Sequence, residues 1–273
     1  METYKFMHSQ EELRWWGDYG VPPLKPNEIY FLSLSCRNKS LTEEERQYYQ
    51  CGRSEMFAKQ QIRHDTWEDF LKHVKRFEVR RDAYLTKSGV PFPQKSLVVY
   101  WNLTPIDVVK AMRDQISHLI EIQSALTDSA LKGSKAALDD SFHKARKSFD
   151  TAQSLFARNF GTKVWVDIDV DKSDMSDSDY CEIRAFFEGE ASFRVGDVMY
   201  VRTGGGIHCL IRKSALNVNP KWIGESIQGR IGAKEAVVNS NQMMPLPGTF
   251  QYGDRPVYVM NKDDFSEGDK LHR

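Results

Sequence analysis

Residues 164–171 read Val-Trp-Val-Asp-Ile-Asp-Val-Asp, an apolar and β-branched run that carries an acid at every second place. Side chains on a strand alternate between its two faces, so Asp167, Asp169 and Asp171 share one face, and Val166, Ile168 and Val170 share the other. A row of carboxylates is unfavourable unless a cation meets it, and Mg²⁺ prefers carboxylate oxygen ligands. The stretch therefore predicts either a divalent-metal site on a buried strand or a strand end that runs into an acidic, solvated loop.

A glycine-rich hairpin is predicted further along the chain. Residues 197–202 and 207–212 have the pattern of two strands, and Thr203 to Gly206 that of a tight loop between them. Consecutive glycines permit positive φ angles and close approach to a phosphate, and successive backbone amides in such a loop can bind an anion. His208 begins the returning strand beside this loop. It is either a ligand of that anion or a structural histidine with its hydrogen bonds satisfied.

A third motif lies at residues 243–253, which read Met-Met-Pro-Leu-Pro-Gly-Thr-Phe-Gln-Tyr-Gly, and a further segment follows at 255–259. The order D-x-D, then T-G-x-G-x-H, then P-x-P-G-T resembles the archaeo-eukaryotic primase superfamily, which includes small primases and primase-polymerases of phages and plasmids. The resemblance covers residues 160–260 well and the N-terminal half only loosely.

The resemblance implies a role for each motif. In that family the acid pair binds the catalytic metals, here Mg²⁺ or Mn²⁺, and the histidine and its glycine loop hold the phosphates of the nucleotide. Carried onto this chain, the metal-binding acids are Asp167 and Asp169, which form the catalytic set with His208. The residues expected to hold the nucleotide are Thr203, Gly204, Gly205 and Gly206, with added charge from Arg202, Arg212 and Lys213. Arg37 and Lys39, in an early strand-to-helix turn, are further nucleotide-binding candidates and are otherwise surface residues.

The chain departs from the family pattern at the third acid. The family usually places that acid a few residues before the P-G-T, where this chain has Val237 to Gln242 without a carboxylate. An amide oxygen also coordinates hard cations but adds no charge, which lowers the metal affinity. Asn241 is the metal-ligand candidate in this segment, and the role of Asn239 stays open. The acids that would substitute are Asp171, Glu235 and Asp254, and the sequence does not choose among them.

The resemblance implies a DNA-directed nucleotidyltransferase, a primase or primase-polymerase, that adds NTPs or dNTPs on a single-stranded DNA template. Two divalent ions held by Asp167 and Asp169 would lower the pKa of an attacking hydroxyl and neutralise the departing pyrophosphate. Replacing Asp167 by Ala is expected to abolish incorporation and to leave the fold intact. The first alternative is a non-catalytic primase-like module that binds nucleotide or single-stranded DNA in a replication assembly. The second is a metal-dependent phosphodiesterase that uses the same acids and histidine to activate water.

Composition limits how a nucleic acid can be bound. The 273 residues carry 38 basic and 38 acidic side chains, so a nucleic acid would have to be held by a local basic patch. One candidate, with interleaved aromatics and otherwise a solvated helix face, comprises Arg63, Lys72, Lys75, Arg76, Arg80 and Arg81. A second candidate, again otherwise a solvated face, comprises Lys144, Arg146 and Lys147. A replicative helicase or polymerase is a further expected partner.

The cysteines and the N-terminal sequence indicate the cellular compartment in which the protein is expected. The four cysteines, Cys36, Cys51, Cys181 and Cys209, are widely spaced without a C-x-x-C pair, which favours reduced thiols over a structural zinc site. The N-terminus lacks a signal-peptide pattern, and no apolar run approaches the roughly 20 residues of a membrane span. We therefore expect a soluble cytoplasmic protein, or one of the host cytoplasm if it is phage-encoded, without a membrane partner.

Capping signals predict two helices in the N-terminal half. Thr42 and Glu45 have capping-box spacing, ahead of a polar stretch that reaches about Lys59. Thr104 would cap a longer helix with Pro105 at its first position, and an apolar stripe follows at Val108, Met112, Ile116, Leu119 and Leu126. The other expected elements are a short helix and an irregular arm in 1–27, strands at 28–35 and 96–101, a helix at 65–77 and exposed helices at 135–157.

The C-terminal half predicts strands and helices around the three motifs. The segment 176–179 begins a helix that runs to about Glu188, Pro220 begins another helix, and a strand ends near Val238. The tail at 262–273 is charged and is expected to be frayed.

These elements predict an α+β fold. The expected architecture is a primase-like core in which a mixed, mostly antiparallel, RRM-like sheet is backed by helices and is preceded by an N-terminal α/β half. Residues 1–160 would form the N-terminal α/β and helical subdomain, and residues 161–273 the catalytic subdomain. The two together are expected to make one compact domain of primase type.

Overall fold

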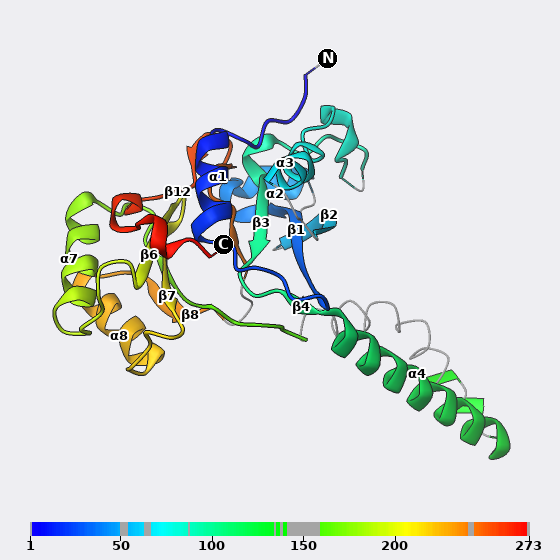
Figure 1. The fold of residues 1–273 in the computed structure, drawn as a ribbon. Helices are drawn as coiled ribbons and strands as arrows, with labels where there is room; N and C mark the ends of the chain where they lie inside the picture. The colour runs from blue at the N-terminus through cyan, green and yellow to red at the C-terminus, as the bar shows by residue number, and fades with distance from the viewer. Residues whose placement is uncertain are drawn as a thin grey trace. The chain divides into compact units, whose positions relative to one another are not determined.

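The computed structural model describes residues 2–49, 54–62, 67–86, 88–133, 135–136, 139–140, 159–239 and 243–271, with only the backbone for 54–62 and 67–69. The chain divides into two compact units (Figure 1). The first unit comprises Met1–Pro23, Tyr30–Leu103 and Lys163–Arg273, and the second comprises Leu24–Ile29 and Thr104–Thr162. The described residues form six α-helices and sheets whose strand pairings are all antiparallel, which confirms the α+β class.

One sheet of the first unit has the strand order β2-β1-β3-β9. Its strands are β1 (Glu28–Arg37), β2 (Ser54–Ile62), β3 (Leu97–Asn102) and β9 (Met243–Pro245). Strands β1 and β3 are the two predicted in the N-terminal half. Strand β2 is not predicted, because its largely polar sequence lacks clear alternation and the strand depends on pairing with β1. Helix α2 (Glu43–Tyr49) ends before β2 and begins with the predicted capping box of Thr42 and Glu45.

The second sheet of this unit has the strand order β12-β6-β7-β5-β8. Its strands are β5 (Trp165–Asp171), β6 (Val198–Thr203), β7 (Gly206–Arg212), β8 (Glu235–Val238) and β12 (Tyr258–Val259). Strand β5 lies between β7 and β8, so hydrogen bonds hold its backbone on both sides. This central position fixes the face of the sheet that each acid of β5 occupies.

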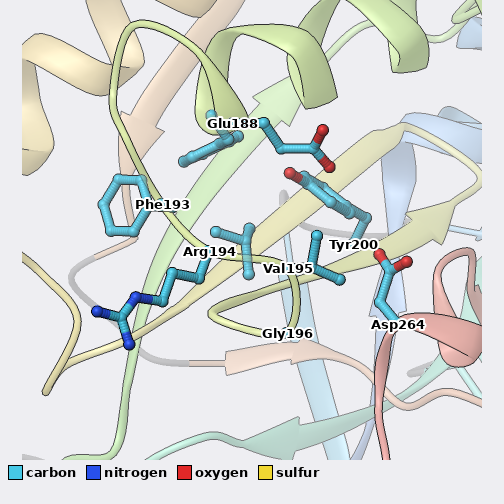
Figure 2. Close-up of a pocket in the computed structure, with 9 residues that line it drawn as sticks. Glu188, Phe193, Arg194, Val195, Gly196, Tyr200 and Asp264 are labelled. Atoms are coloured by element: carbon cyan, nitrogen blue, oxygen red, sulfur yellow. The ribbon is translucent and has the colours of Figure 1, made fainter.

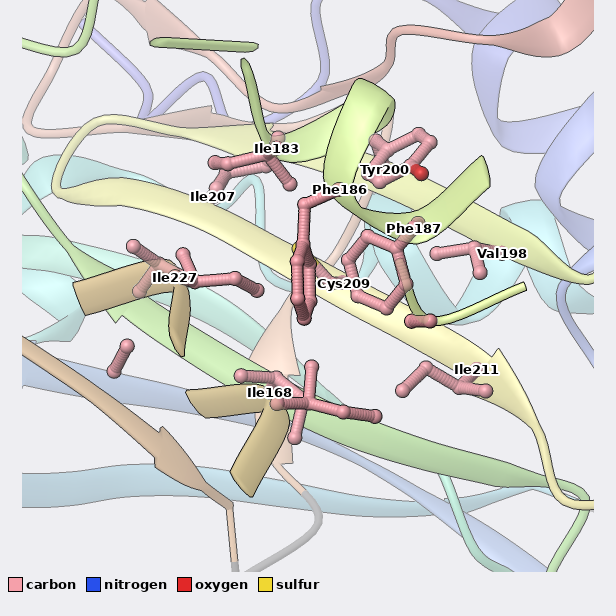
Figure 3. Close-up of a cluster of buried hydrophobic side chains, with 14 of the residues drawn as sticks. Ile168, Ile183, Phe186, Phe187, Val198, Tyr200, Ile207, Cys209, Ile211 and Ile227 are labelled. Atoms are coloured by element: carbon pink, nitrogen blue, oxygen red, sulfur yellow. The ribbon is translucent and has the colours of Figure 1, made fainter. Parts of the chain in front are cut away.

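Two helices cover one face of the second sheet, α7 (Asp177–Glu188) and α8 (Pro220–Ile231). Figure 3 shows the resulting cluster, in which Ile168 of β5 and Cys209 of β7 pack with Phe186 of α7 and Ile227 of α8. Burying an aliphatic or aromatic side chain of this size contributes about 1.5–3 kcal/mol. The apolar residues of β5 therefore hold its alternate residues, the acids, on the opposite face.

Both helices begin where the sequence predicts. Ser176 and Asp179 form a reciprocal capping box, with the Ser176 amide donating to Asp179 Oδ2 at 2.7 Å and the Asp179 amide to Ser176 Oγ at 3.2 Å. Pro220 is the first residue of α8, and the preceding Asn219 accepts from the Lys221 amide at 2.9 Å. These caps satisfy donors that would otherwise be exposed at the helix ends.

The C-terminal segment packs against helix α1 (Gln10–Tyr19), so the prediction of a frayed tail is wrong for the described part. Phe265 is buried, and its ring meets the Trp15 ring edge to face at a centroid distance of 5.5 Å. The ammonium group of Lys262 pairs with the buried carboxylate of Glu12. These contacts help to order a segment whose composition alone suggests solvation.

Replacing Phe265 by Ala should lower the free energy of unfolding by about 3 kcal/mol, because the change removes a buried aromatic ring. Urea unfolding followed by tryptophan fluorescence measures the difference. The matched control is Tyr48→Ala, since Tyr48 is an exposed aromatic residue, and its effect should stay within about 0.5 kcal/mol. Similar small effects for both variants would show that the C-terminal segment adds no stability.

The second unit contains the short strand β4 (Ile106–Asp107) and the long helix α4 (Val108–Leu131). The predicted cap at Thr104 is wrong, because Asp107 caps α4 by accepting from the Lys110 amide at 2.9 Å. Ile106 pairs with Ile29 of β1, so the chain is extended up to Asp107 and the helix cannot begin earlier. A tertiary pairing therefore overrides a strong local signal.

Helix α4 buries a different stripe from the predicted one. Met112, Ile116 and Leu119 are exposed, whereas Ala111 and Ile122 are buried. The spacing of the apolar residues indicates the helix correctly but does not identify its covered face.

Some expectations fall outside the described residues: Arg63, Asn241, Cys51, the basic group Lys144, Arg146 and Lys147, and most of the helices predicted at 135–157. Among the described cysteines, Cys181 and Cys209 are free thiols. None of the described helices has the length and apolar character needed to cross a bilayer.

Candidate active site

The three acids of β5 lie on the face of the second sheet that is opposite to its helix-covered core. Asp167 is fully buried, whereas the side chain of Asp169 is 47% exposed and that of Asp171 is 28% exposed. The apolar residues between them are buried in the core, and the pleat of the strand turns the carboxylates away from it. The acids share one face, as the alternation predicts, but they differ in access to solvent.

His208 lies on the same face, across from Asp169 in the register of β5 and β7. Its Nδ1 donates to Asp167 and is 3.0 Å from each carboxylate oxygen, while its Nε2 is 3.7 Å from Asp169 Oδ1. Burial opposes protonation of the ring, but Asp167 and Asp169 outweigh burial and raise the pKa of His208 to about 9. At neutral pH, His208 is therefore a buried cation paired with Asp167.

Asn239 completes the surroundings of Asp167. Its side-chain amide donates to Asp167 Oδ2 at 2.8 Å and to Met243 O at 2.9 Å, and its backbone amide donates to Asp167 O at 2.9 Å. The segment that lacks a third acid thus places a hydrogen-bond donor beside the buried carboxylate. Sequence reasoning leaves this residue without a role, although its place between β8 and the P-G-T motif is the available signal. Asn241, the metal-ligand candidate, is outside the described residues.

The glycine loop of the β6–β7 hairpin packs against a smaller hairpin made by β10 (Phe250–Gln251) and β11 (Arg255–Pro256). The Gly204 amide donates to Gln251 Oε1 at 2.7 Å, and Gly204 O accepts from Arg255 Nη1 at 2.9 Å. Gly205 O accepts from the Lys172 amide at 2.9 Å. The Gly204 amide already donates to a protein acceptor, so it is not available to bind an anion as the sequence predicts.

Two of the loop glycines are required by close packing. A Cβ on Gly206, where φ is +157°, would lie 1.9 Å from Val170 O on the neighbouring strand. A Cβ on Gly204 would lie 2.6 Å from the Tyr252 ring. Tyr252 itself has a φ of 56°, a left-handed conformation that costs a residue with a Cβ roughly 1–2 kcal/mol. The loop and Tyr252 are therefore fixed against each other, an arrangement that the motif alone does not reveal.

Lys39 reaches the acid face from the turn after β1, and Arg37 is the last residue of β1. Lys39 Nζ is 3.1 Å from Asp171 Oδ2, and the Arg37 guanidinium lies over the Tyr100 ring at 5.6 Å from its centroid. Burial raises the pKa of the Tyr100 hydroxyl, an effect that Arg37 reduces and that Asp169 reinforces. The structure therefore brings Lys39 to a carboxylate of β5 and Arg37 to the neighbouring Tyr100 ring.

Three other predicted basic residues do not meet the carboxylates. Val201 is the residue that pairs with His208, so Arg202 points to the opposite, helix-covered face and donates to Met175 O. Arg212 donates to Asp269 O at 3.0 Å in the C-terminal segment. Lys213 is exposed beyond the end of β7. Strand alternation explains the position of Arg202, and the unpredicted packing of the C-terminal segment explains that of Arg212.

The basic patch near helix α3 (Trp67–Lys75) is exposed in its described part. Two of its arginines are paired with acids: Arg80 is 2.5 Å from Asp82, and Arg81 is 2.7 Å from Glu2. Exposed ion pairs of this kind contribute little to stability.

A cavity of about 10 Å³ lies at the C-terminal end of α7, where Glu188, Phe193, Tyr200 and Asp264 contribute to its lining (Figure 2). Its volume is that of about one water molecule. Tyr200 belongs to the helix-covered core, so this cavity is on the opposite side of the sheet from the acids. It is too small for a nucleotide, and the acid face remains the candidate site.

The chemistry of the acid face fits a hard cation that arrives with a substrate. No group of three or more His, Cys, Asp or Glu side chains suited to a metal occurs in the described part of the chain. Mg²⁺ usually binds one or two carboxylates together with substrate phosphates and waters, and does not require an all-protein cage. The half-exposed Asp169, next to Asp167 and Asp171, can supply the one or two carboxylates that such a site requires.

The buried pair of Asp167 and His208 makes stability depend on pH. The pKa of His208 is about 9 in the folded protein and returns to its ordinary 6.5 on unfolding, so the added stability is fully present below pH 6.5. It is lost as pH rises through 9, with a slope of up to about 1.4 kcal/mol per pH unit. Urea unfolding at pH 6, 7, 8 and 9 with EDTA should show this decline.

The control for the pH series is Asp167→Asn, in which His208 loses its nearest charged partner and keeps only the more distant Asp169, so the decline should become clearly shallower. Parallel slopes for the two proteins would contradict the assignment. The same burial corrects the expectation that Asp167→Ala leaves the fold intact, because removing one partner of a buried ion pair costs about 3 kcal/mol.

No protein-family model, no curated protein and no solved structure matches this chain. The fold and the site define an α+β protein whose antiparallel sheet presents a buried Asp–His pair beside a half-exposed carboxylate.

Proposed function

We propose that the protein is a DNA-directed nucleotidyltransferase of primase type, which adds NTPs or dNTPs on a single-stranded DNA template with Mg²⁺ or Mn²⁺. One observation carries this proposal: the half-exposed Asp169 lies beside the Asp167–His208 pair, and Lys39 reaches the same face from the turn after β1. Carboxylates next to cationic side chains suit a triphosphate with its metal ion, because each charge of the complex finds its opposite.

Each residue has a distinct task in this proposal. Asp169 would hold the divalent cation, with Asp167 or Asp171 as the second carboxylate. A bound cation would neutralise the triphosphate and lower the pKa of the attacking hydroxyl. His208 holds Asp167 in place through its Nδ1 proton. Lys39, now 3.1 Å from Asp171, would exchange this carboxylate for a phosphate oxygen.

A second candidate function is a non-catalytic module that binds nucleotide or single-stranded DNA. Asn239 favours it, because an amide that donates to Asp167 stands where another carboxylate would strengthen metal binding. Nucleotide binding by Lys39 and Arg37 would persist in such a module.

The test is primer synthesis and primer extension on single-stranded DNA with labelled NTPs or dNTPs and Mg²⁺ or Mn²⁺. Product that requires template, nucleotide and cation, and that is lost in Asp169→Asn, supports the proposal. Nucleotide binding that weakens in Lys39→Ala, without product in any condition, favours the module. Loss of a pre-formed labelled strand without added nucleotide would indicate a phosphodiesterase.

A further inference from the structure

Asn239 contacts Asp167 twice, once through its side chain and once through its backbone amide. The side-chain amide also donates to Met243 O at 2.9 Å, so its nitrogen is held between β5 and the first residue of β9. With the amide on Oδ2 and His208 Nδ1 within 3.0 Å of both oxygens, the Asp167 carboxylate accepts hydrogen bonds entirely from the protein.

The charges on the acid face differ in how well they are compensated. Asp167 is paired with His208 at 3.0 Å, and Asp171 is paired with Lys39 at 3.1 Å. Asp169 has the longer contact, 3.7 Å to His208 Nε2, and the most exposed side chain of the three acids. Asn239 adds no negative charge to this face. Of the three acids, Asp169 is therefore the one whose charge the described cationic side chains compensate least.

We propose that Asn239 is a positioning residue that keeps Asp167 engaged within the protein, so that the divalent cation is bound at Asp169 together with the nucleotide and only weakly by the free protein. The proposal rests on the proposed function for the identity of the cation and the nucleotide. The amide of Asn239 donates a hydrogen bond to Asp167 Oδ2 and so stabilises its negative charge. A carboxylate at residue 239 would instead repel Asp167, and a bound metal ion would then be required to neutralise the two carboxylates.

The experiment is a Mn²⁺ titration of the full chain without nucleotide, with free Mn²⁺ followed by its electron paramagnetic resonance signal. Wild type should bind Mn²⁺ weakly, and Asn239→Asp should bind about tenfold more tightly or better, since ligand charge sets the affinity of such sites. The Tm of Asn239→Asp should also rise with Mn²⁺ more than that of wild type. The matched control is Asn217→Asp, which adds the same charge on an exposed loop and should behave as wild type.

A folded Asn239→Asp protein that binds Mn²⁺ no more tightly than Asn217→Asp overturns the proposal, as does tight binding by wild type without nucleotide. If Asn239→Asp does not fold, Asn239→Ser removes the amide donor without adding charge. It should then bind Mn²⁺ more tightly than wild type, and unchanged affinity overturns the proposal. The Mn²⁺ titration contains no nucleotide or template, so its result does not depend on activity. A failure to incorporate nucleotides in the primer-synthesis assay would refute the proposed function and is therefore a separate outcome.

Discussion

Replacing Asp169 by Asn is expected to reduce template-dependent nucleotide incorporation by about 1,000-fold, equivalent to about 4 kcal/mol of transition-state stabilisation. The change removes the carboxylate that has the greatest access to an incoming cation, while keeping the size of the side chain. Asp169 is 47% exposed, and its 3.7 Å contact with His208 is longer than the 3.0 Å contact of Asp167, so the Tm should stay within about 2 °C of wild type. Primer extension and thermal unfolding on the same preparations measure both quantities.

Asp177→Asn is the matched control for this experiment, because Asp177 is an exposed acid in the first turn of α7. Its incorporation rate should equal that of wild type. If Asp169→Asn retained more than about a tenth of the wild-type rate, Asp169 would not hold the catalytic cation.

Replacing Gly206 by Ala is expected to lower the free energy of unfolding by about 3 kcal/mol or more, because the new Cβ would lie 1.9 Å from Val170 O. Both atoms belong to paired strands, so neither can move without breaking the β5–β7 register. The same displacement would shift His208 relative to Asp167. Urea unfolding should therefore show a lower midpoint, and the pH dependence assigned to His208 should weaken.

Gly229→Ala separates this close contact from the general effect of replacing a glycine. Gly229 lies in α8, and a Cβ built there meets nothing within 4 Å. Alanine should stabilise the helix by up to about 1 kcal/mol. Equal effects for the two variants would show that the packing of Gly206 against β5 is not the source of the loss.

The elements around the acids could be predicted because their signals are local. Strand β5 alternates apolar and acidic residues, and the capping box at Ser176 fixes the start of α7. Both signals act through neighbouring residues of one chain segment, so no tertiary contact is needed to interpret them. The same reasoning fails at Thr104, where pairing of Ile106 with β1 keeps the chain extended.

The partners of the acids could not be predicted in this way. Asn239 reaches Asp167 because β8 pairs with β5, and Lys39 reaches Asp171 from the turn that follows β1. Arg202 has the charge expected of a phosphate ligand, but its place in the alternation of β6 turns it to the helix-covered face. Residue type alone cannot distinguish these outcomes, since strand pairing and register decide them.

The sequence by itself determined the α+β class, the row of acids on one face of β5 and the glycine hairpin that carries His208. Only the tertiary structure decided that Asp167 is buried in a pair with His208, that Asn239 donates to it, and that Asp169 is the accessible carboxylate. The physical reason is the range of the interactions. Side-chain alternation and capping act over a few residues, whereas burial and charge pairing depend on strands that are distant in the chain.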